Sequence, residues 1–215
     1  YGATDTTCAV ATVSLKELLR FIKNSEEGER KKVAAYFKRS ERNPILVPDP
    51  QVKWKEKAVF NPAAIALDGK VHMVYRAMDN DNTSVFGYAV SKDGTRFTDY
   101  PEPIYKPREA FEEKRVPGGN SGCEDPRLTV IDKTIYMCYT AFNGAEAQRV
   151  ALSSIPVHKF LKQDWDWAHP VLISPPRMDD KDACVFPEKV KGKYMIFHRL
   201  GESIDLAFTP SLKFD

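Results

Sequence analysis

A short run near the middle of the chain holds the side chains best suited to chemistry. Glu124, Asp125 and Arg127 set two carboxyl groups beside a guanidinium at the start of an apolar strand, Leu128 to Ile131. A carboxyl group next to a fixed cation is a candidate general acid. Basic side chains recur at similar points of neighbouring segments, and these are Arg76, Arg149, Lys181, His198 and Arg199. One acid near several cationic side chains that can donate hydrogen bonds to an anion meets the needs of a glycosidase that uses phosphate.

Composition limits the class of protein. The 215 residues are 42% hydrophobic and 29% charged, which is typical of a globular chain with a sizeable core. The net charge of +2 gives no overall attraction to nucleic acid or to an anionic membrane. No apolar run approaches the roughly 20 residues that span a bilayer, and the first residues given do not combine a basic segment with an apolar one, as a signal peptide does. We expect a cytoplasmic protein with no nucleic-acid or membrane partner, and the sequence leaves the oligomeric state open.

Neither cysteine nor histidine spacing indicates a metal site. The four cysteines contain no C-x-x-C pair, and most lie among apolar residues, so free structural thiols are expected: Cys8, Cys123, Cys138 and Cys184. The four histidines are too far apart to form a local metal motif.

Two helices are expected near the N-terminus, after a strand from Cys8 to Val13. Ser14 and Glu17 form a capping box, and the apolar residues that follow keep helical spacing. A second, highly charged run from Glu26 to Arg39 is expected to be a mostly solvated helix.

From Asn43 onward, short apolar stretches separated by Asp-Gly, Lys-Gly and proline-rich turns are typical of antiparallel strands. Three segments share one plan, in which a proline leads into two strands. Pro62, Pro126 and Pro187 lie 64 and 61 residues apart (126 − 62 and 187 − 126). Such a repeat favours a β-propeller over a β-sandwich, because a sandwich does not predict a motif that returns at near-constant spacing. A propeller needs four or more blades, whereas this segment holds about three, so the ring cannot close with it alone.

Five ordered motifs resemble glycoside hydrolase family 130, the mannoside phosphorylases and related β-mannosidases. They lie between about Asn43 and Phe208 and comprise Phe60 to Ala64, Val74 to Ala77, Gly122 to Leu128, Arg149 to Leu152, and Lys181 to Lys189 with Gly192 to Tyr194 and His198-Arg199. The catalytic domain of this family is a five-bladed β-propeller. The resemblance therefore implies an all-β fold, with about three blades here and a helical segment before them.

The first residues, Tyr1 to Thr6, resemble the end of a domain of the same family. We therefore expect residues 1–25 to be the last strands and helix of a preceding propeller, 26–42 a helical linker, and 43–215 the first three blades of the next propeller. The chain would then be a fragment of a tandem protein, with a circular permutation as the alternative.

The resemblance assigns the general acid to the aspartate of the Glu-Asp-Pro-Arg motif, Asp125, which in the family acts through a hydroxyl of the mannosyl unit. From the residues alone, Asp125 is as readily a turn former before Pro126. Glu124 is either a substrate ligand or a structural carboxylate that pairs with a strand arginine or with backbone donors. A single acid suffices for phosphorolysis, whereas inverting hydrolysis needs a second carboxylate to activate water.

Guanidinium forks match phosphate oxygens, so the recurring basic residues predict a phosphate cradle. The expected phosphate ligands are Arg76, Lys181, Arg149, His198 and Arg199, of which the first two match the family positions best. The simpler alternatives are a solvated arginine at a strand end and a histidine that only satisfies a neighbour.

The expected substrate ligands are Asn61, Glu124, Arg127 and Asp182. Arg127 has the alternative role of orienting Asp125. Asp5 matches a mannose-binding aspartate of the family and would serve the preceding propeller. The tryptophans are expected to pack between blades rather than to stack on sugars, and these are Trp54, Trp165 and Trp167.

The leading prediction is an inverting phosphorylase that cleaves β-mannosides with inorganic phosphate and gives α-mannose 1-phosphate, with no metal or organic cofactor. Its partners would be a mannose-containing oligosaccharide and phosphate. A β-mannoside hydrolase of the same family is one alternative, and a non-catalytic carbohydrate-binding propeller is the other. The linkage and the leaving sugar are not determined by the sequence.

Overall fold

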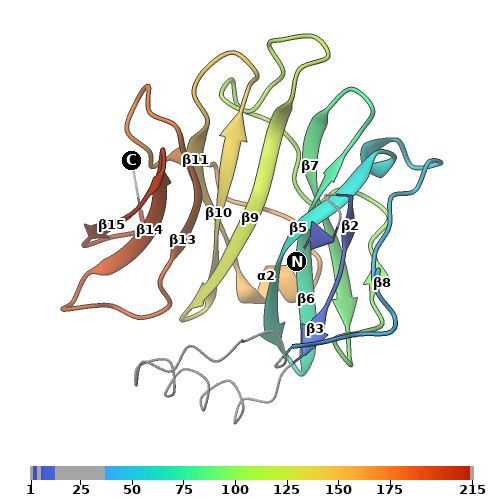
Figure 1. Cartoon of the computed structure of the whole chain (residues 1–215). Helices are drawn as coiled ribbons and strands as arrows, with labels where there is room; N and C mark the ends of the chain where they lie inside the picture. Colours follow the sequence, from blue (N-terminus) through green and yellow to red (C-terminus); the bar gives the residue numbers. More distant parts are fainter. Residues whose placement is uncertain (1, 4–5, 13–36, 214–215) are drawn as a thin grey trace, which may run out of the picture.

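The computed structural model describes residues 2–3, 6–12 and 37–213, and these ranges are almost entirely β-structure (Figure 1). The strands stand side by side in a fan that runs from the N-terminal strands to β15. None of the helices in these ranges has the length and apolar character needed to cross a membrane.

Three antiparallel units make up the fan. Unit 1 consists of β5 (Ala58–Leu67), β6 (Lys70–Met78), β7 (Thr83–Ser91) and β8 (Thr98–Asp99), and the short 3-10 helix η2 (Lys53–Lys55) precedes it. Unit 2 consists of β9 (Ser121–Ile131), β10 (Thr134–Phe142), β11 (Arg149–Pro156) and β12 (Val171–Leu172). Unit 3 consists of β13 (Asp180–Val185), β14 (Tyr194–Leu200) and β15 (Ser203–Thr209).

Tight turns and one parallel contact fix this arrangement. Asp68 and Gly69 join β5 to β6 with φ angles of 48° and 67°, the left-handed pair that a two-residue hairpin turn requires. β7 pairs in parallel with β9, so units 1 and 2 form one continuous sheet of eight strands. The helix α2 (Val157–Leu161) lies between β11 and β12. The sequence pattern did not predict it, since helical periodicity ends before Asn43.

The first strand of each unit carries the same irregularity. Asn61, Asp125 and Asp182 have φ angles of 46°, 52° and 55°, and the strand register shifts at each of them. Asparagine and aspartate tolerate this left-handed conformation better than most residues. The three positions lie 64 and 57 residues apart (125 − 61 and 182 − 125). Each unit therefore projects one polar side chain from a bulge in its first strand.

This bulge corrects two sequence-based predictions. The acidic run does not precede a strand at Leu128, because β9 begins at Ser121 and the run lies within it. Pro187 is not the equivalent of Pro62 and Pro126, since the residue after the third bulge is Ala183 and Pro187 lies beyond β13. The prediction aligned the prolines, whereas the left-handed residue is the feature that repeats.

The hydrophobic core lies mainly between the units. Units 1 and 2 meet through a cluster rich in aromatic rings that includes Phe86, Tyr139 and Phe160, and Trp165 and Trp167 pack in or against it. Units 2 and 3 meet through smaller residues: Cys138, Val150, Leu152, Ala183, Val185 and Ile196. The tryptophans thus pack as expected, and all four cysteines are free.

The N-terminal segment lies against unit 1. β1 (Gly2–Ala3) pairs with β2 (Thr7–Cys8), and β3 (Ala11–Thr12) pairs with β4 (Lys38–Arg39). Cys8 is buried beside Val59 and Tyr75 in a third cluster. Lys38 and Arg39 form the strand β4, so the helix expected from Glu26 to Arg39 does not include these two residues. The rest of that helix, the helix expected from Ser14, and Asp5 lie outside the described residues, and the domain boundaries stay predictions.

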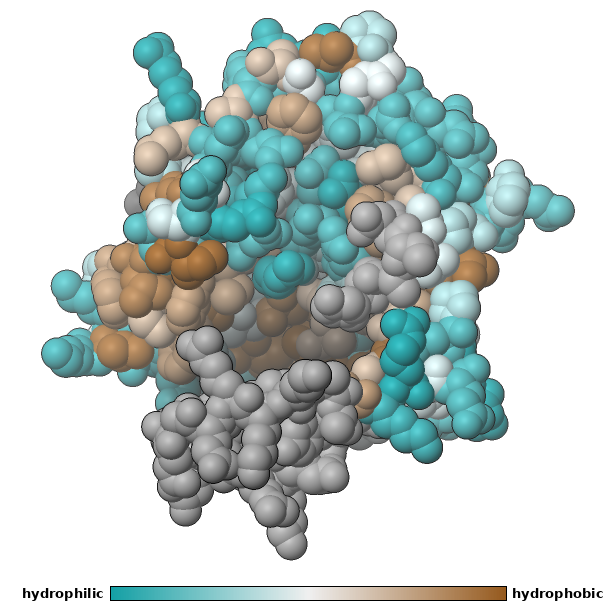
Figure 2. Space-filling model, in the orientation of Figure 1, coloured by the Kyte–Doolittle hydropathy of each residue, from teal (hydrophilic) through white to brown (hydrophobic). Residues whose placement is uncertain are grey.

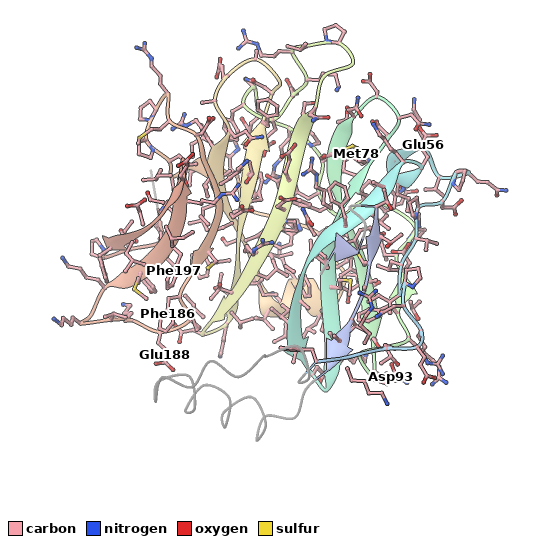
Figure 3. The ribbon with its side chains drawn as sticks, in the orientation of Figure 1. Glu56, Met78, Asp93, Phe186, Glu188 and Phe197 are labelled. Carbon is pink, nitrogen blue, oxygen red and sulfur yellow. The ribbon has the colours of Figure 1, made fainter. Side chains whose placement is uncertain are left out.

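The outer face of unit 3 carries exposed apolar side chains. Ile204, Leu206 and Phe208 on β15 are 69%, 52% and 49% exposed. By strand register, Ile204 and Leu206 occupy the positions that Val150 and Leu152 of unit 2 use to pack against unit 3. Figure 2 shows a hydrophobic area over this part of the molecule. Phe186 and Phe197 lie side by side on the same unit (Figure 3), with their ring centroids 6.3 Å apart.

Candidate active site

Asp125 lies at the junction of units 1 and 2 and is held through one oxygen. Its Oδ1 accepts hydrogen bonds from Asn61 Nδ2 at 2.9 Å and from Arg76 Nη1 at 3.1 Å. In the described part of the chain, Oδ2 has no hydrogen-bond partner, and the side chain keeps 19% exposure. A carboxyl group fixed at one oxygen and accessible at the other can carry a proton toward a ligand.

Arg76 on β6 ties unit 1 to the acidic run. Its Nε donates to Ser84 Oγ at 2.9 Å, and its Nη2 donates to Glu124 Oε1 at 2.8 Å. The guanidinium also lies over the Phe60 ring, 4.7 Å from the centroid. Arg76 therefore has little freedom to move, and it serves both carboxylates at once.

Glu124 is the buried member of the pair of acids. Burial raises the pKa of Glu124 above its ordinary value, and the charge of Arg76 opposes that shift. The contact with Arg76 matches the structural alternative for Glu124, a carboxylate paired with a strand arginine. Lys181 and Asp182 also influence the pKa of Glu124, in opposite directions, so both lie within electrostatic reach of it.

Gly122 allows the backbone to bring these groups together. Its φ is 106°, and a Cβ atom there would lie 2.2 Å from the carbonyl oxygen of Ser84. Gly122 and Ser84 are register partners in the parallel contact between β9 and β7. Only glycine fits so close an approach, and the approach places Glu124 and Asp125 opposite Arg76.

Asp182 is the equivalent of Asp125 in unit 3, but its partners differ. Arg199 Nη2 lies 3.1 Å from Asp182 Oδ2, and Arg127 Nη2 lies 3.8 Å from Oδ1. Arg127 also donates to the carbonyl oxygen of Pro126. No hydrogen bond or ion pair joins Arg127 to Asp125 among the described residues. Asn61 and Arg76 are the side chains that hold Asp125.

Arg149 and His198 meet at a second cluster, between units 2 and 3. Arg149 Nη2 donates to the carbonyl oxygen of Ser174 at 2.7 Å, and Ser174 Oγ donates to Asp180 Oδ2 at 2.7 Å. His198 Nδ1 lies 2.7 Å from the same Asp180 oxygen. Two of the expected phosphate ligands are thereby tied to one loop residue.

Lys181 lies in sequence between Asp180 and Asp182 on β13. Its ammonium group makes no hydrogen bond or ion pair with the residues that the structure describes, although its charge reaches Glu124. A lysine without a committed partner beside a buried carboxylate is available to an anionic ligand.

A hollow of ≈ 600 Å³ runs between the first strands of the three units. It is lined by Asn61 to Ala64 of β5, Arg127 to Thr129 of β9, and Cys184 and Val185 of β13. In the view of Figure 2, the surface of the molecule is hollowed near the middle. Asn61 is the residue that both lines the hollow and contacts Asp125, so the hollow opens beside the acid.

Four residues of these clusters were missed by sequence reasoning. Ser84, Gly122, Ser174 and Asp180 hold the predicted residues in place. Small and acidic residues of this kind carry no local signal, because their roles depend on contacts between units. Within the described ranges, no group of three or more histidine, cysteine and acidic side chains is arranged to hold a metal ion.

Together these features define an all-β protein of repeated units, with a carboxyl group held by Asn61 and Arg76 at one junction and further cationic side chains at the next. Residues 31–212 match the profile of the family described as beta-1,4-mannooligosaccharide phosphorylase. The chain belongs to this family, glycoside hydrolase family 130, as its motifs indicated.

Relatives of known sequence or structure agree with this assignment. A 1,2-beta-oligomannan phosphorylase from Thermoanaerobacter sp. (strain X514) is 38% identical over 186 residues, which is 82% of this chain and 58% of that protein. A glycosyl hydrolase from Bacteroides ovatus has a similar structure, with a TM-score of 0.66 and 26% identity over 80% of this chain and 55% of that one. Another similar structure comes from work on family members that are hydrolases of beta-1,2 mannosidic linkages in Candida mannan. Its TM-score is 0.65 at 26% identity, over 80% of this chain and 55% of that one. The chain thus spans a little over half the length of these relatives.

Proposed function

We propose that the protein is an inverting phosphorylase of β-mannosides that uses inorganic phosphate and releases α-mannose 1-phosphate. The observation that carries this proposal is the state of Asp125. One oxygen is fixed by Asn61 and Arg76, and the other is without a partner among the described residues. The relative named as a phosphorylase and the description of the family profile support the choice of reaction.

In this mechanism the Asp125 proton leaves from Oδ2. It passes to the glycosidic oxygen, through a hydroxyl of the mannosyl unit in the manner described for the family. A phosphate oxygen attacks the anomeric carbon from the opposite face, the bond to the leaving sugar breaks, and the configuration inverts. Asp125 ends as a carboxylate that Arg76 and Asn61 stabilise, and a proton from the solvent restores the acid.

The phosphate ligands in this proposal are Lys181, Arg149, His198 and Arg199. Lys181 has no hydrogen-bond or ion-pair partner among the described residues, and Arg149 and His198 are held together through Ser174 and Asp180. Arg76 was expected to be a phosphate ligand too, but three of its N–H groups already serve Ser84, Glu124 and Asp125. We propose that Arg76 mainly holds Asp125. Its two remaining N–H groups could also donate hydrogen bonds to phosphate.

For the whole protein we propose a closed five-bladed propeller in which units 1 to 3 are three blades. The exposed apolar residues of β15 support a further blade on unit 3. Ile204 and Leu206 repeat the positions through which unit 2 packs against unit 3. Burial of this face would stabilise the ring, since each large apolar side chain contributes about 1.5–3 kcal/mol when fully buried.

We propose β-1,2-linked manno-oligosaccharides as the first substrates to examine. The relative with 38% identity is named for that linkage, and the family description names the β-1,4 linkage, so both belong in the comparison. Asn61 and Asp182 are the proposed contacts to sugar hydroxyls, because both project from bulges beside the hollow.

A second candidate is hydrolysis of β-mannosides, favoured by the similarity to a family structure from work on hydrolases. That reaction needs a carboxylate to activate water. Glu124, the nearest other carboxylate, is buried and paired with Arg76, which makes it a poor base for water in the hollow.

Incubation of the full-length protein with β-1,2- and β-1,4-mannobiose, with and without phosphate, separates these functions. Phosphorolysis predicts α-mannose 1-phosphate only when phosphate is present, identified by its ³¹P and ¹H NMR signals. Release of free mannose at the same rate without phosphate would establish the hydrolase instead. Absence of turnover on both sugars, with measurable sugar binding, would establish a binding module.

A further inference from the structure

A buried carboxylate that the proposed mechanism leaves without a role lies between units 2 and 3. Asp180 at the start of β13 has 0% exposure. Its Oδ2 accepts hydrogen bonds from Ser174 Oγ and His198 Nδ1, and its Oδ1 has no hydrogen-bond partner in the described structure. A carboxylate buried in this way is costly unless a positive group compensates it.

His198 is the group placed to compensate Asp180. Because a carboxylate only accepts hydrogen bonds, the contact of 2.7 Å requires the hydrogen to be on Nδ1. This contact fixes both the ring orientation and the tautomer of His198.

The other ring nitrogen of His198 is the one left for a ligand. Nε2 bonds to none of the described residues, and it is not among the buried atoms that lack a partner, so it keeps some contact with solvent. With Nδ1 bound to Asp180, a proton on Nε2 makes the ring a cationic donor toward an anion.

Ser174 holds this arrangement in place. Its Oγ accepts the backbone N–H of Val150 at 2.6 Å and donates to Asp180, while its carbonyl oxygen accepts from Arg149. The position of the His198 ring is thereby coupled to β11 and to the Arg149 guanidinium. Both side chains are proposed phosphate ligands.

We propose that Asp180 is a positioning residue for the phosphate site, which binds Nδ1–H of His198 and presents Nε2–H to the phosphate. This inference rests on the proposed phosphorolysis. Asp180 itself does not touch the substrate, and its effect on the reaction passes through His198.

The kinetic test compares Asp180→Asn with Asp205→Asn in the full-length protein. Asp205 is the register partner of His198 on β15, but it hydrogen bonds to Ser203. Asp180→Asn is expected to raise the phosphate KM about tenfold or more, the size of one lost charge-assisted hydrogen bond, and to change the mannobiose KM less than threefold. Asp205→Asn is expected to leave both constants within twofold. Equal phosphate KM values for a folded Asp180→Asn variant and the wild type would overturn the proposal.

A spectroscopic test observes the wild-type protein directly and needs a variant only to assign the signal. In ¹⁵N-labelled wild-type protein, the His198 ring is expected to show a protected Nδ1–H signal, assigned by its absence in His198→Gln. Added inorganic phosphate is expected to shift the Nε2 signal. An Nδ1 without hydrogen, or an Nε2 signal unmoved by phosphate that binds in calorimetry, would refute the role of Asp180.

These outcomes separate the inference from the proposed function. A wild-type protein that releases no mannose 1-phosphate but shows both His198 signals refutes the reaction and leaves a histidine anion site. A protein that is an active phosphorylase without these signals retains the reaction and refutes the positioning role of Asp180.

Discussion

The junction between units 1 and 2 and the junction between units 2 and 3 use one backbone plan for two kinds of chemistry. Both have a left-handed aspartate in a bulged first strand, Asp125 in one and Asp182 in the other. At the first junction the preceding unit supplies Arg76 to the acid. At the second, the equivalent position holds Thr140, whose hydroxyl lies 3.5 Å from the Asp182 backbone nitrogen. The backbone fixes where the carboxylate stands, and the neighbouring unit decides what it can do.

The same contrast holds one residue earlier on the second strands. Tyr139 of unit 2 and His198 of unit 3 occupy equivalent positions, and each contacts a buried carboxylate. Tyr139 donates to Glu112 within an aromatic core, whereas His198 faces Asp180. Tyr139 lies among aromatic rings, whereas the partners of His198 are polar. The first junction thus holds the proposed acid, and the second holds cationic side chains that we propose as phosphate ligands.

The largest expected effect separates Asp125 from the other aspartates. Asp125→Asn keeps the acceptor oxygen for Asn61 and Arg76 but cannot donate a proton as an acid, so kcat for phosphorolysis is expected to fall about 10³-fold with little loss of stability. Asp132→Asn, in the turn after β9, is the matched control and is expected to retain wild-type kcat. Asp182→Asn is expected to act mainly on the mannobiose KM. A fall in kcat for Asp182→Asn as large as that for Asp125→Asn would remove the distinction between the junctions.

Arg76 and its equivalent Arg199 test how differently the two junctions use a cation. Arg76→Ala leaves Glu124 buried without a partner, and about 3–5 kcal/mol of unfolding free energy is expected to be lost. Arg199→Ala breaks an ion pair that is 38% exposed on the arginine side, and less than about 1 kcal/mol is expected. Urea unfolding monitored by tryptophan fluorescence measures both. Glu124→Gln in the Arg76→Ala background is expected to recover part of the loss, and equal losses for the two arginines would contradict this account.

Gly122 tests whether the close contact of β9 with β7 is what assembles the first junction. Gly122→Ala is expected to cost about 3 kcal/mol, because it adds a clash with the Ser84 backbone to the strain of a positive φ. Gly201 has a φ of 57° and nothing within 4 Å of an added Cβ, so Gly201→Ala is expected to cost about 1 kcal/mol from φ strain alone. The midpoint of thermal unfolding is compared between the two variants. A Gly122→Ala variant as stable as Gly201→Ala would show that β9 and β7 can move apart without a loss of stability.

The smallest expected effect is the pH dependence from Glu112. Burial raises the pKa of Glu112 above its ordinary value of 4.5, with the hydrogen bond from Tyr139 acting against it. The folded protein therefore binds this proton more tightly than the unfolded chain, and the stability it contributes is full below about pH 4.5 and is lost as the pH rises through the folded-state pKa.

Glu112→Gln cannot lose that proton, so its stability relative to wild type is expected to increase by about 1 kcal/mol from pH 4.5 to pH 7.5. Calorimetric unfolding across this range measures the trend. Glu146→Gln, in an exposed ion pair with Arg115, is expected to change stability by less than about 0.5 kcal/mol. If the stability of Glu112→Gln and that of the wild type changed in parallel with pH, the burial of Glu112 would have no effect on its pKa.

The sequence predicts the all-β class, because strands and turns are local patterns, and the resemblance to the family points to Asp125 as the acid. It misplaces the third repeat, since the proline that follows the bulge in units 1 and 2 is Ala183 in unit 3. The signal that repeats is an asparagine or aspartate that adopts a left-handed conformation. Arg127, the nearest cation in the sequence, was predicted as a substrate ligand with orientation of Asp125 as an alternative, but the cation that contacts Asp125 is Arg76, across the junction. Contacts between units decide such pairings, and spacing along one chain does not reveal them.

The most direct test of the central claim compares leaving groups in the wild type and Asp125→Asn. Dinitrophenolate leaves from 2,4-dinitrophenyl β-mannoside without protonation, whereas the sugar of mannobiose needs a proton. We predict that Asp125→Asn lowers kcat/KM for mannobiose about 10³-fold and for the dinitrophenyl substrate less than about tenfold, both with phosphate present. Equal losses on the two substrates would contradict the role of Asp125 as the proton donor.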